Sequence, residues 1–155
     1  MIDQQERLIA QIWEKRDPDL PLNDINEFVT LASIVEKETA LAEERPRVAG
    51  VFVNRLERGM RLQSDPTIIY GIFGGEGKPA DRPIYQSDID NPTPYNTYQI
   101  DGLPPGPIAI PGRASLEAVA NPAQTEDLFF VADGTGGHAF SRTLDEHNAN
   151  VRRWR

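Results

Sequence analysis

The segment from Gly71 to Gly112 is the feature that most restricts what this chain can fold into. It is dense in Gly, Pro, Asn, Asp and Tyr, and it shows neither helical nor strand periodicity. A connection of this length without regular structure is unusual inside a compact domain. Its apolar side chains, among them Tyr95, Tyr98 and Ile108, predict that it packs as an ordered loop. The regular elements must therefore come from the residues on either side of it.

Helical periodicity and capping signals flank this loop. Asp3 with Glu6, and Asp24 with Glu27, have the spacing of capping boxes at helix starts. The expected helices cover residues 3–16, 25–42, 46–58, 65–70 and 113–120, and a last helix is capped by Thr143 and Glu146. Residues 128–132 and 138–141 are expected to form a β-hairpin around residues 133–137. The pattern predicts an α+β fold that is mainly helical.

The composition argues against several kinds of partner and cofactor. The formal net charge is -8, with 16 basic and 24 acidic residues. Because no basic block stands out, we do not expect nucleic acid or an anionic membrane surface as a partner. The chain has no cysteine, and His138 and His147 are its two histidines, which is too few for a typical zinc site. We expect neither a metal nor an organic cofactor.

Two carboxylates lie in an otherwise apolar helical stretch, Leu31–Thr39. On a helical wheel Glu36 and Glu38 fall on opposite flanks of the apolar stripe, so they are not expected to share one cleft. Burial against apolar neighbours raises the pKa of a carboxyl, which lets it donate a proton near neutral pH, as a glycosidase acid must. The wheel alone favours two solvated surface glutamates.

The loops supply the other polar candidates. Taken alone, Gln63–Thr67 is more typical of a helix cap than of a site. The segment Tyr95–Tyr98 carries amide, hydroxyl and aromatic groups that suit sugar binding, but ordinary loops carry them too. Pro104–Pro107 is read as a fixed turn rather than a polyproline ligand. His138, at the start of a predicted strand, is expected to be structural.

Six short motifs follow one another along the chain. They are Leu31–Thr39, Val48–Leu56, Gly59–Thr67, Pro92–Tyr98, Gly102–Ile108 and Phe130–Gly134. Together they resemble the endolytic murein transglycosylase (YceG-like) family, over about residues 28–151. The resemblance implies a lyase that cleaves the bond between N-acetylmuramic acid and N-acetylglucosamine in peptidoglycan. It further implies that one glutamate acts first as acid and then as base, and that the product has an anhydro-muramoyl end.

The resemblance also implies which residues form the site. The catalytic glutamate of the family matches Glu36, and Glu38 is assigned a supporting role. The other residues expected to bind substrate or support the site are Gln63, Asp65, Thr67, Tyr95, Asn96 and Thr97. The long loop is expected to form the substrate cleft, with its polar residues near Glu36.

The resemblance also implies the fold of a lysozyme-like catalytic domain with a small β-hairpin. We expect residues 1–155 to form one domain, with residues 1–22 as N-terminal helix and linker and residues 23–155 as core. Members of the family are usually anchored in the cytoplasmic membrane and act on its outer, periplasmic side. This chain is therefore expected to be excised from a longer anchored protein, with glycan strands and possible cell-wall synthesis proteins as partners.

Two alternatives stay open. A muramidase would hydrolyse the same bond with water and would need a second carboxylate about 5–9.5 Å from the acid; Asp65 is the candidate, although its place before Pro66 favours a capping role. A glycan-binding scaffold module would bind strands without cleaving them.

Overall fold

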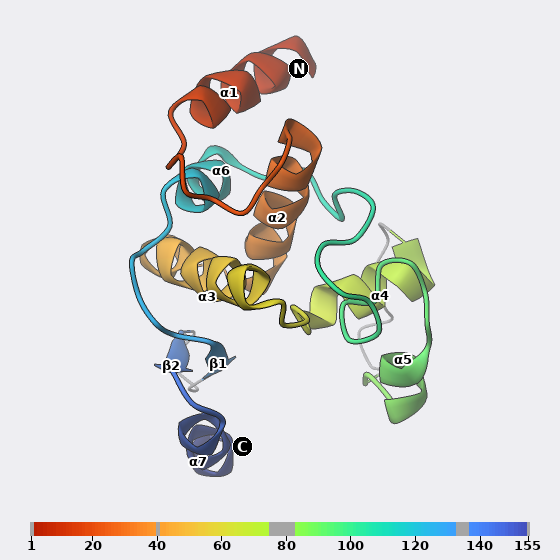
Figure 1. Ribbon diagram of the computed structural model, residues 1–155. Helices are drawn as coiled ribbons and strands as arrows, with labels where there is room; N and C mark the ends of the chain where they lie inside the picture. The colour runs from red at the N-terminus through yellow and green to blue at the C-terminus, as the bar shows by residue number, and fades with distance from the viewer. Residues whose placement is uncertain (1, 40, 75–82, 133–136, 155) are drawn as a thin grey trace.

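The computed structural model describes residues 2–39, 41–74, 83–132 and 137–154 (Figure 1). Its elements are α1 (Ile2–Glu14), α2 (Ile25–Glu38), the 3-10 turn η1 (Ala42–Glu44), α3 (Arg45–Arg58), α4 (Asp65–Phe73), α5 (Gln86–Asp90), α6 (Arg113–Ala120), β1 (Phe129–Ala132), β2 (His138–Ser141) and α7 (Leu144–Trp154). The predicted α+β class is confirmed, because a helical body carries one small two-stranded sheet. None of the helices in these ranges is both long and apolar enough to cross a bilayer.

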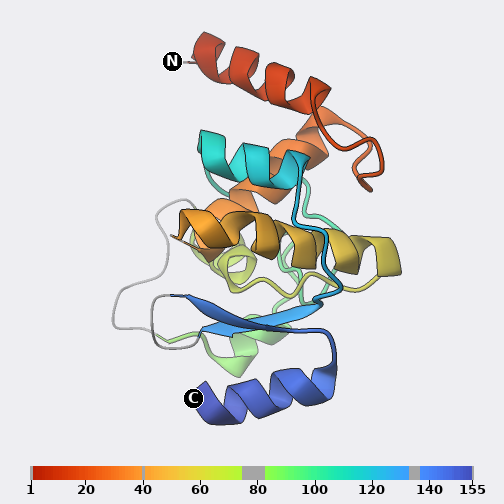
Figure 2. The same cartoon turned by 90° about the vertical axis from the view of Figure 1, so that its left-hand side faces the viewer.

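The core lies where α2, α3 and α6 pack together, with α1 against α2 and α6. Figure 2 shows these helices stacked above the hairpin, which in turn lies above α7. Phe28 and Leu31 of α2, Phe52 of α3 and Leu116 of α6 are almost completely buried. Because most buried side chains of α2 belong to this core, the helix is held rigidly and its C-terminal end is fixed in space.

The start of α2 follows the sequence signal, whereas its end does not. Asp24 Oδ1 accepts a hydrogen bond from the Glu27 N–H at 2.9 Å, so the predicted cap is confirmed. The helix ends at Glu38, and the predicted continuation to Ala42 is wrong. Thr39 takes an extended conformation, and its Oγ1 accepts a hydrogen bond from the Leu41 N–H at 3.1 Å. This local side-chain bond replaces the next helical turn.

At the two ends of the chain one capping prediction is wrong and one is confirmed. Asp3 lies inside α1, which already includes Ile2, and so it is not the N-cap. At α7 the predicted cap is present, because Thr143 Oγ1 accepts a hydrogen bond from the Glu146 N–H at 3.2 Å.

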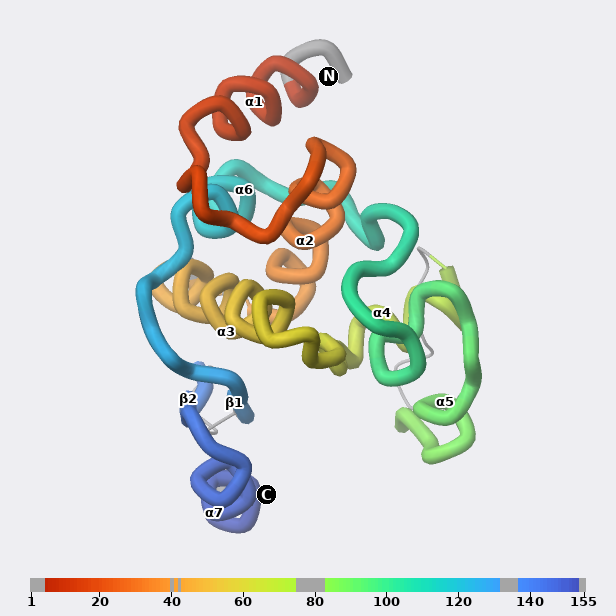
Figure 3. The backbone as a smooth tube through the Cα atoms, in the orientation of Figure 1, coloured from red at the N-terminus to blue at the C-terminus, as the bar shows by residue number. Residues whose placement is uncertain are grey.

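The long segment is ordered wherever the structure describes it. It contains one short helix, α5, that periodicity did not predict, and α4 runs to Phe73 instead of ending at Tyr70. Figure 3 shows the chain turning back from α5 past α4 before it climbs to α6. Asn96 and Thr97 are buried in this part of the loop, so the expectation of a packed loop is confirmed for residues 83–112.

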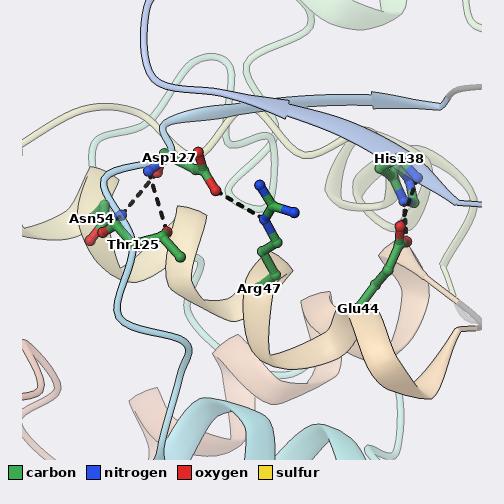
Figure 4. Close-up of polar contacts among 6 residues, drawn as sticks. All are labelled: Glu44, Arg47, Asn54, Thr125, Asp127 and His138. Atoms are coloured by element: carbon green, nitrogen blue, oxygen red, sulfur yellow. Dashed lines mark hydrogen bonds and ion pairs between the residues drawn. The ribbon is translucent and has the colours of Figure 1, made fainter.

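The hairpin pairs β1 with β2 in antiparallel register, with Phe130 opposite Phe140. The turn predicted at residues 133–137 lies outside the described residues except for Gly137. The segment leading into β1 is fastened to α3 (Figure 4), where Asn54 Nδ2 donates to the Asp127 carbonyl at 2.9 Å and Arg47 Nε to the Asp127 carboxylate at 3.1 Å.

A second fastening joins β2 to η1. His138 donates its backbone N–H to Glu44 Oε2 at 2.8 Å, and its Nδ1 lies 2.8 Å from Glu44 Oε1 (Figure 4). Thr39 Oγ1 reaches the same Glu44 Oε1 at 3.4 Å. His138 therefore has the structural role expected of it, and the hairpin is connected to the residue that follows α2.

Candidate active site

A pocket of about 300 Å³ opens beside the C-terminal end of α2. It is lined by Glu38, Arg55, Leu62, Gln63, Asp65, Tyr98, Phe129, Phe130, Leu144 and His147. These residues come from α2, α3, the α3–α4 connection, α4, the long loop, β1 and α7, which can be followed in Figure 1. The pocket thus combines one polar wall with a second wall from β1 and α7, in which Phe129, Phe130 and Leu144 are apolar and His147 is polar.

Glu38 is the half-buried carboxyl of this pocket. Burial raises its pKa from 4.5 to about 7, and the negative charge of Asp65 acts in the same direction. A hydrogen bond from Ser64 Oγ to Glu38 Oε1, 3.0 Å long, acts against this rise. A carboxyl in this state is protonated below neutral pH and can return to its charged form without a large cost.

Asp65 and Tyr98 form a pair next to Glu38. The Tyr98 hydroxyl donates to Asp65 Oδ1 at 2.7 Å. Burial and this bonded carboxylate raise the pKa of Tyr98 well above its ordinary value, so the phenol keeps its proton. Asp65 was expected at the site, and the structure places it there with its carboxylate held by a neutral donor.

Gln63 and Arg55 form another part of the polar wall. Gln63 has φ of +53° and is the one residue other than glycine with positive φ in the described ranges. Arg55 is buried, which lowers its pKa. Its Nε donates to the Leu128 carbonyl at 2.7 Å and its Nη1 to the Arg61 carbonyl at 2.9 Å. Strained backbone at a pocket is a feature of functional sites.

Glu36 lies on another side of α2 and does not line this pocket. Its Oε1 accepts hydrogen bonds from the Gly112 N–H at 2.8 Å and from Ser115 Oγ at 3.0 Å, and its Oε2 lies 3.8 Å from Arg45 Nη2. These contacts tie α2 to the start of α6. The structure therefore gives Glu38 the position beside the polar loop residues that the sequence analysis expected for Glu36.

The remaining predicted residues do not line the pocket. Thr67 and Thr97 are fully buried and contact each other through their hydroxyls. Asn96 is buried too, and its Nδ2 donates to the Asn91 carbonyl at 2.7 Å, which shapes the loop. Tyr95 packs its ring on Tyr70, with ring centroids 4.7 Å apart. Of the expected residues outside α2, only Gln63 and Asp65 line the pocket.

Sequence reasoning did not select Arg55, Ser64 and Tyr98 as site residues. All three lie within motifs that carried the family resemblance, which was the available signal. No sequence pattern pointed to the second wall from β1 and α7. Across the described ranges, no group of three or more His, Asp or Glu side chains is arranged to hold a metal ion.

Similarity to known proteins extends over most of the chain. The chain is 43% identical over 124 residues to an endolytic murein transglycosylase of Bacillus subtilis, and the match covers 80% of this chain and 33% of that protein. It is 41% identical over 130 residues to an endolytic murein transglycosylase of Streptococcus pneumoniae, covering 82% of this chain and 23% of that protein. The chain thus spans a third or less of these relatives.

A solved structure and a family match agree with these relatives. The fold is similar to a 2.6 Å crystal structure of a putative YceG-like protein from Listeria monocytogenes, with a TM-score of 0.71 and 40% identity, covering 81% of this chain and 38% of that one. The YceG-like family matches residues 1–153. Since the match takes in both the helical body and the hairpin that enclose the pocket, the chain belongs to the YceG-like family.

Proposed function

We propose that this chain is a peptidoglycan lytic transglycosylase domain that cleaves the bond between N-acetylmuramic acid and N-acetylglucosamine within glycan strands, with Glu38 as its acid and base. The observation that carries the proposal is the half-buried Glu38 carboxyl with a pKa of about 7 in a pocket of about 300 Å³. The names of the relatives support the reaction class.

The proposed reaction needs only one protein carboxyl. Protonated Glu38 gives its proton to the glycosidic oxygen, and the bond from that oxygen to the muramoyl C1 breaks. The carboxylate then takes the proton of the muramoyl C6 hydroxyl, whose oxygen bonds to C1 and closes the anhydro ring. Glu38 ends protonated, as it began. A pKa near the working pH favours both transfers, because neither protonation state is then strongly disfavoured.

The expected pH dependence follows from the raised pKa of Glu38. The first step requires the protonated carboxyl, so activity is expected to fall as pH rises through about 7. Below this pH activity is expected to level off, because the carboxyl is already protonated before each turnover and its carboxylate form arises within the reaction. Initial rates of glycan cleavage across pH 4–9 (about the range a stable domain tolerates) test this. The titration of the Glu38 carboxyl can be followed separately by NMR. If activity falls at alkaline pH with a midpoint that differs from this titration, Glu38 is not the acid.

One specific observation keeps a hydrolase as the second candidate, because Asp65 lines the same pocket as Glu38. A hydrolase would use this carboxylate to activate water or to attack C1, whereas here it is bonded by the Tyr98 hydroxyl. Mass spectrometry of digested peptidoglycan distinguishes the candidates. Anhydro-muramoyl ends support the lyase, reducing ends support the hydrolase, and intact strands that remain bound indicate a scaffold module.

The setting of the reaction is part of the same proposal. A domain that cuts peptidoglycan acts outside the cytoplasm, on the periplasmic side of the membrane, and its partners are glycan strands and cell-wall synthesis proteins. The proposed proton transfers use no cofactor and no metal. Activity that is lost with chelator and restored by one divalent ion would contradict this expectation.

A further inference from the structure

Ser64 occupies the N-cap of α4 but does not cap it with its side chain. An N-cap serine ordinarily accepts a hydrogen bond from the second or third N–H of the helix, and this stabilises a protein by about 1 kcal/mol. Here Ser64 Oγ lies 3.0 Å from Glu38 Oε1 instead. Ser64 thus gives up the usual side-chain cap of α4, and its free hydroxyl reaches Glu38, the proposed acid.

The backbone of Ser64 is held on both sides by buried threonines. Its N–H donates to Thr97 Oγ1 at 2.8 Å, and its carbonyl accepts from Thr67 Oγ1 at 2.6 Å. The two threonine hydroxyls lie 2.8 Å apart, and both residues are fully buried. They therefore have no access to substrate. Their hydroxyls bond to each other and to the backbone of Ser64, and Thr67 Oγ1 also accepts from the Thr97 N–H at 3.2 Å.

The directions of these bonds follow from counting protons. The single hydroxyl proton of Thr67 is committed to the Ser64 carbonyl, so in the bond between the threonines Thr97 donates and Thr67 accepts. The Thr97 oxygen remains free to accept the Ser64 N–H. The result is a closed ring of hydrogen bonds through Ser64, Thr97 and Thr67. The hydroxyl of Ser64 takes no part in the ring and is free to donate to Glu38.

We propose that Thr67 and Thr97 are positioning residues, which use this ring to hold the Ser64 hydroxyl on Glu38 Oε1 and so leave Oε2 as the oxygen that carries the proton. This role rests on the proposed function of Glu38. It connects Thr97 of the long loop to the acid without any contact between Thr97 and the glycan. It also assigns a role to the hydroxyl of a threonine that substrate cannot reach.

The test compares Thr97→Val with Thr93→Val. Valine has a β-branched side chain like that of threonine but lacks its hydroxyl donor and acceptor. Thr93 lies in the same loop and has a buried Oγ1 without a hydrogen-bond partner in the described structure, so its replacement breaks no bond. Thr97→Ser, which keeps the hydroxyl, is the conservative rescue.

With the ring opened, Ser64 is expected to lose its fixed contact with the Glu38 carboxylate. Glu38 should then titrate at higher pH by carboxyl NMR, since a donor that stabilised its charged form is weakened. The alkaline limb of activity should move up with it, and kcat should fall by roughly tenfold, the size of one hydrogen bond to a charged group, with KM unchanged. Thr97→Ser should restore both readouts, and Thr93→Val should leave them unchanged.

The outcomes separate this role from the function itself. The titration is measured without substrate, so a shifted Glu38 in Thr97→Val supports the ring even if the products prove to be those of a hydrolase. If Thr97→Val titrates like Thr93→Val, the positioning role is overturned. If Thr97→Val does not fold, Thr67→Val opens the same ring at its other hydroxyl and is compared with the same control. The shift in the variant that also carries Ser64→Ala should be smaller than the sum of the two separate shifts, and a fully additive shift would also overturn the role.

Discussion

Replacing Glu38 with glutamine is expected to abolish glycan cleavage and to stabilise the protein above pH 7. Glutamine keeps the size of glutamate but cannot donate or take up the proton, so the rate should fall by at least about 10²–10⁴-fold. Cleavage is followed by release of anhydro-muramoyl products, with binding of intact strands as the check that the pocket still forms.

The gain in stability follows from the raised pKa of Glu38. The folded state binds this proton more tightly than the unfolded chain, so stability falls as pH rises from 4.5 to about 7. The full penalty is present above pH 7 and is on the order of 3 kcal/mol at most. Glu38→Gln has no such penalty, so its Tm should exceed that of the unchanged protein at pH 8 and match it near pH 4.5. Equal Tm values at both pH values would contradict the burial of Glu38.

Glu36→Gln is the matched control for this experiment. The amide oxygen of the glutamine can still accept hydrogen bonds from the Gly112 N–H and Ser115 Oγ. The 3.8 Å ion pair between Glu36 and Arg45 is lost. We expect near-normal cleavage and a stability change below about 1 kcal/mol. Loss of cleavage in Glu36→Gln together with activity in Glu38→Gln would return the catalytic role to Glu36, as the family motif alone suggested.

Replacing Arg55 with methionine is expected to give the largest loss of stability. Arg55 is buried, and its guanidinium donates to the carbonyls of Leu128, Arg61 and Leu62. Methionine fills part of the volume but leaves these acceptors without their donor. The free energy of unfolding should fall by about 2–4 kcal/mol. Urea denaturation measures this as a lower midpoint concentration of urea, with an unchanged dependence of the free energy on urea concentration.

Arg58→Met serves as the control for Arg55→Met, because Arg58 lies on the same helix and is exposed. Its replacement should change the free energy of unfolding by less than about 0.5 kcal/mol. If the two variants lose stability equally, Arg55 does not have the fastening role that its hydrogen bonds indicate.

The helical body was predictable because its signals are local. The cap at Asp24, the bounds of α6 and the cap at Thr143 depend on residues within one helical turn. The end of α2 was not predictable, because Thr39 leaves the helix for a bond with Leu41 and a contact with Glu44 that periodicity does not report.

The candidate site was predictable only in part, for a related reason. Family motifs pointed to Gln63 and Asp65, and both line the pocket. A helical wheel could say that Glu36 and Glu38 face different ways, but not which one faces the hairpin. That choice depends on where β1 and α7 dock, and the docking is set by Arg55, Asn54 and Asp127 across about half of the chain.

The pocket draws its walls from residues as far apart in the sequence as Glu38 and His147, and this has a consequence for the order of folding. Contacts of long sequence separation form late, because the entropy of closing a long loop must be overcome first. A folding chain would complete its helical body before the hairpin and α7 dock. Until then Glu38 would face water with the pKa of an ordinary carboxyl. On the proposed function, the domain would therefore acquire its acid as the last event of folding, and an incompletely folded chain would be inactive.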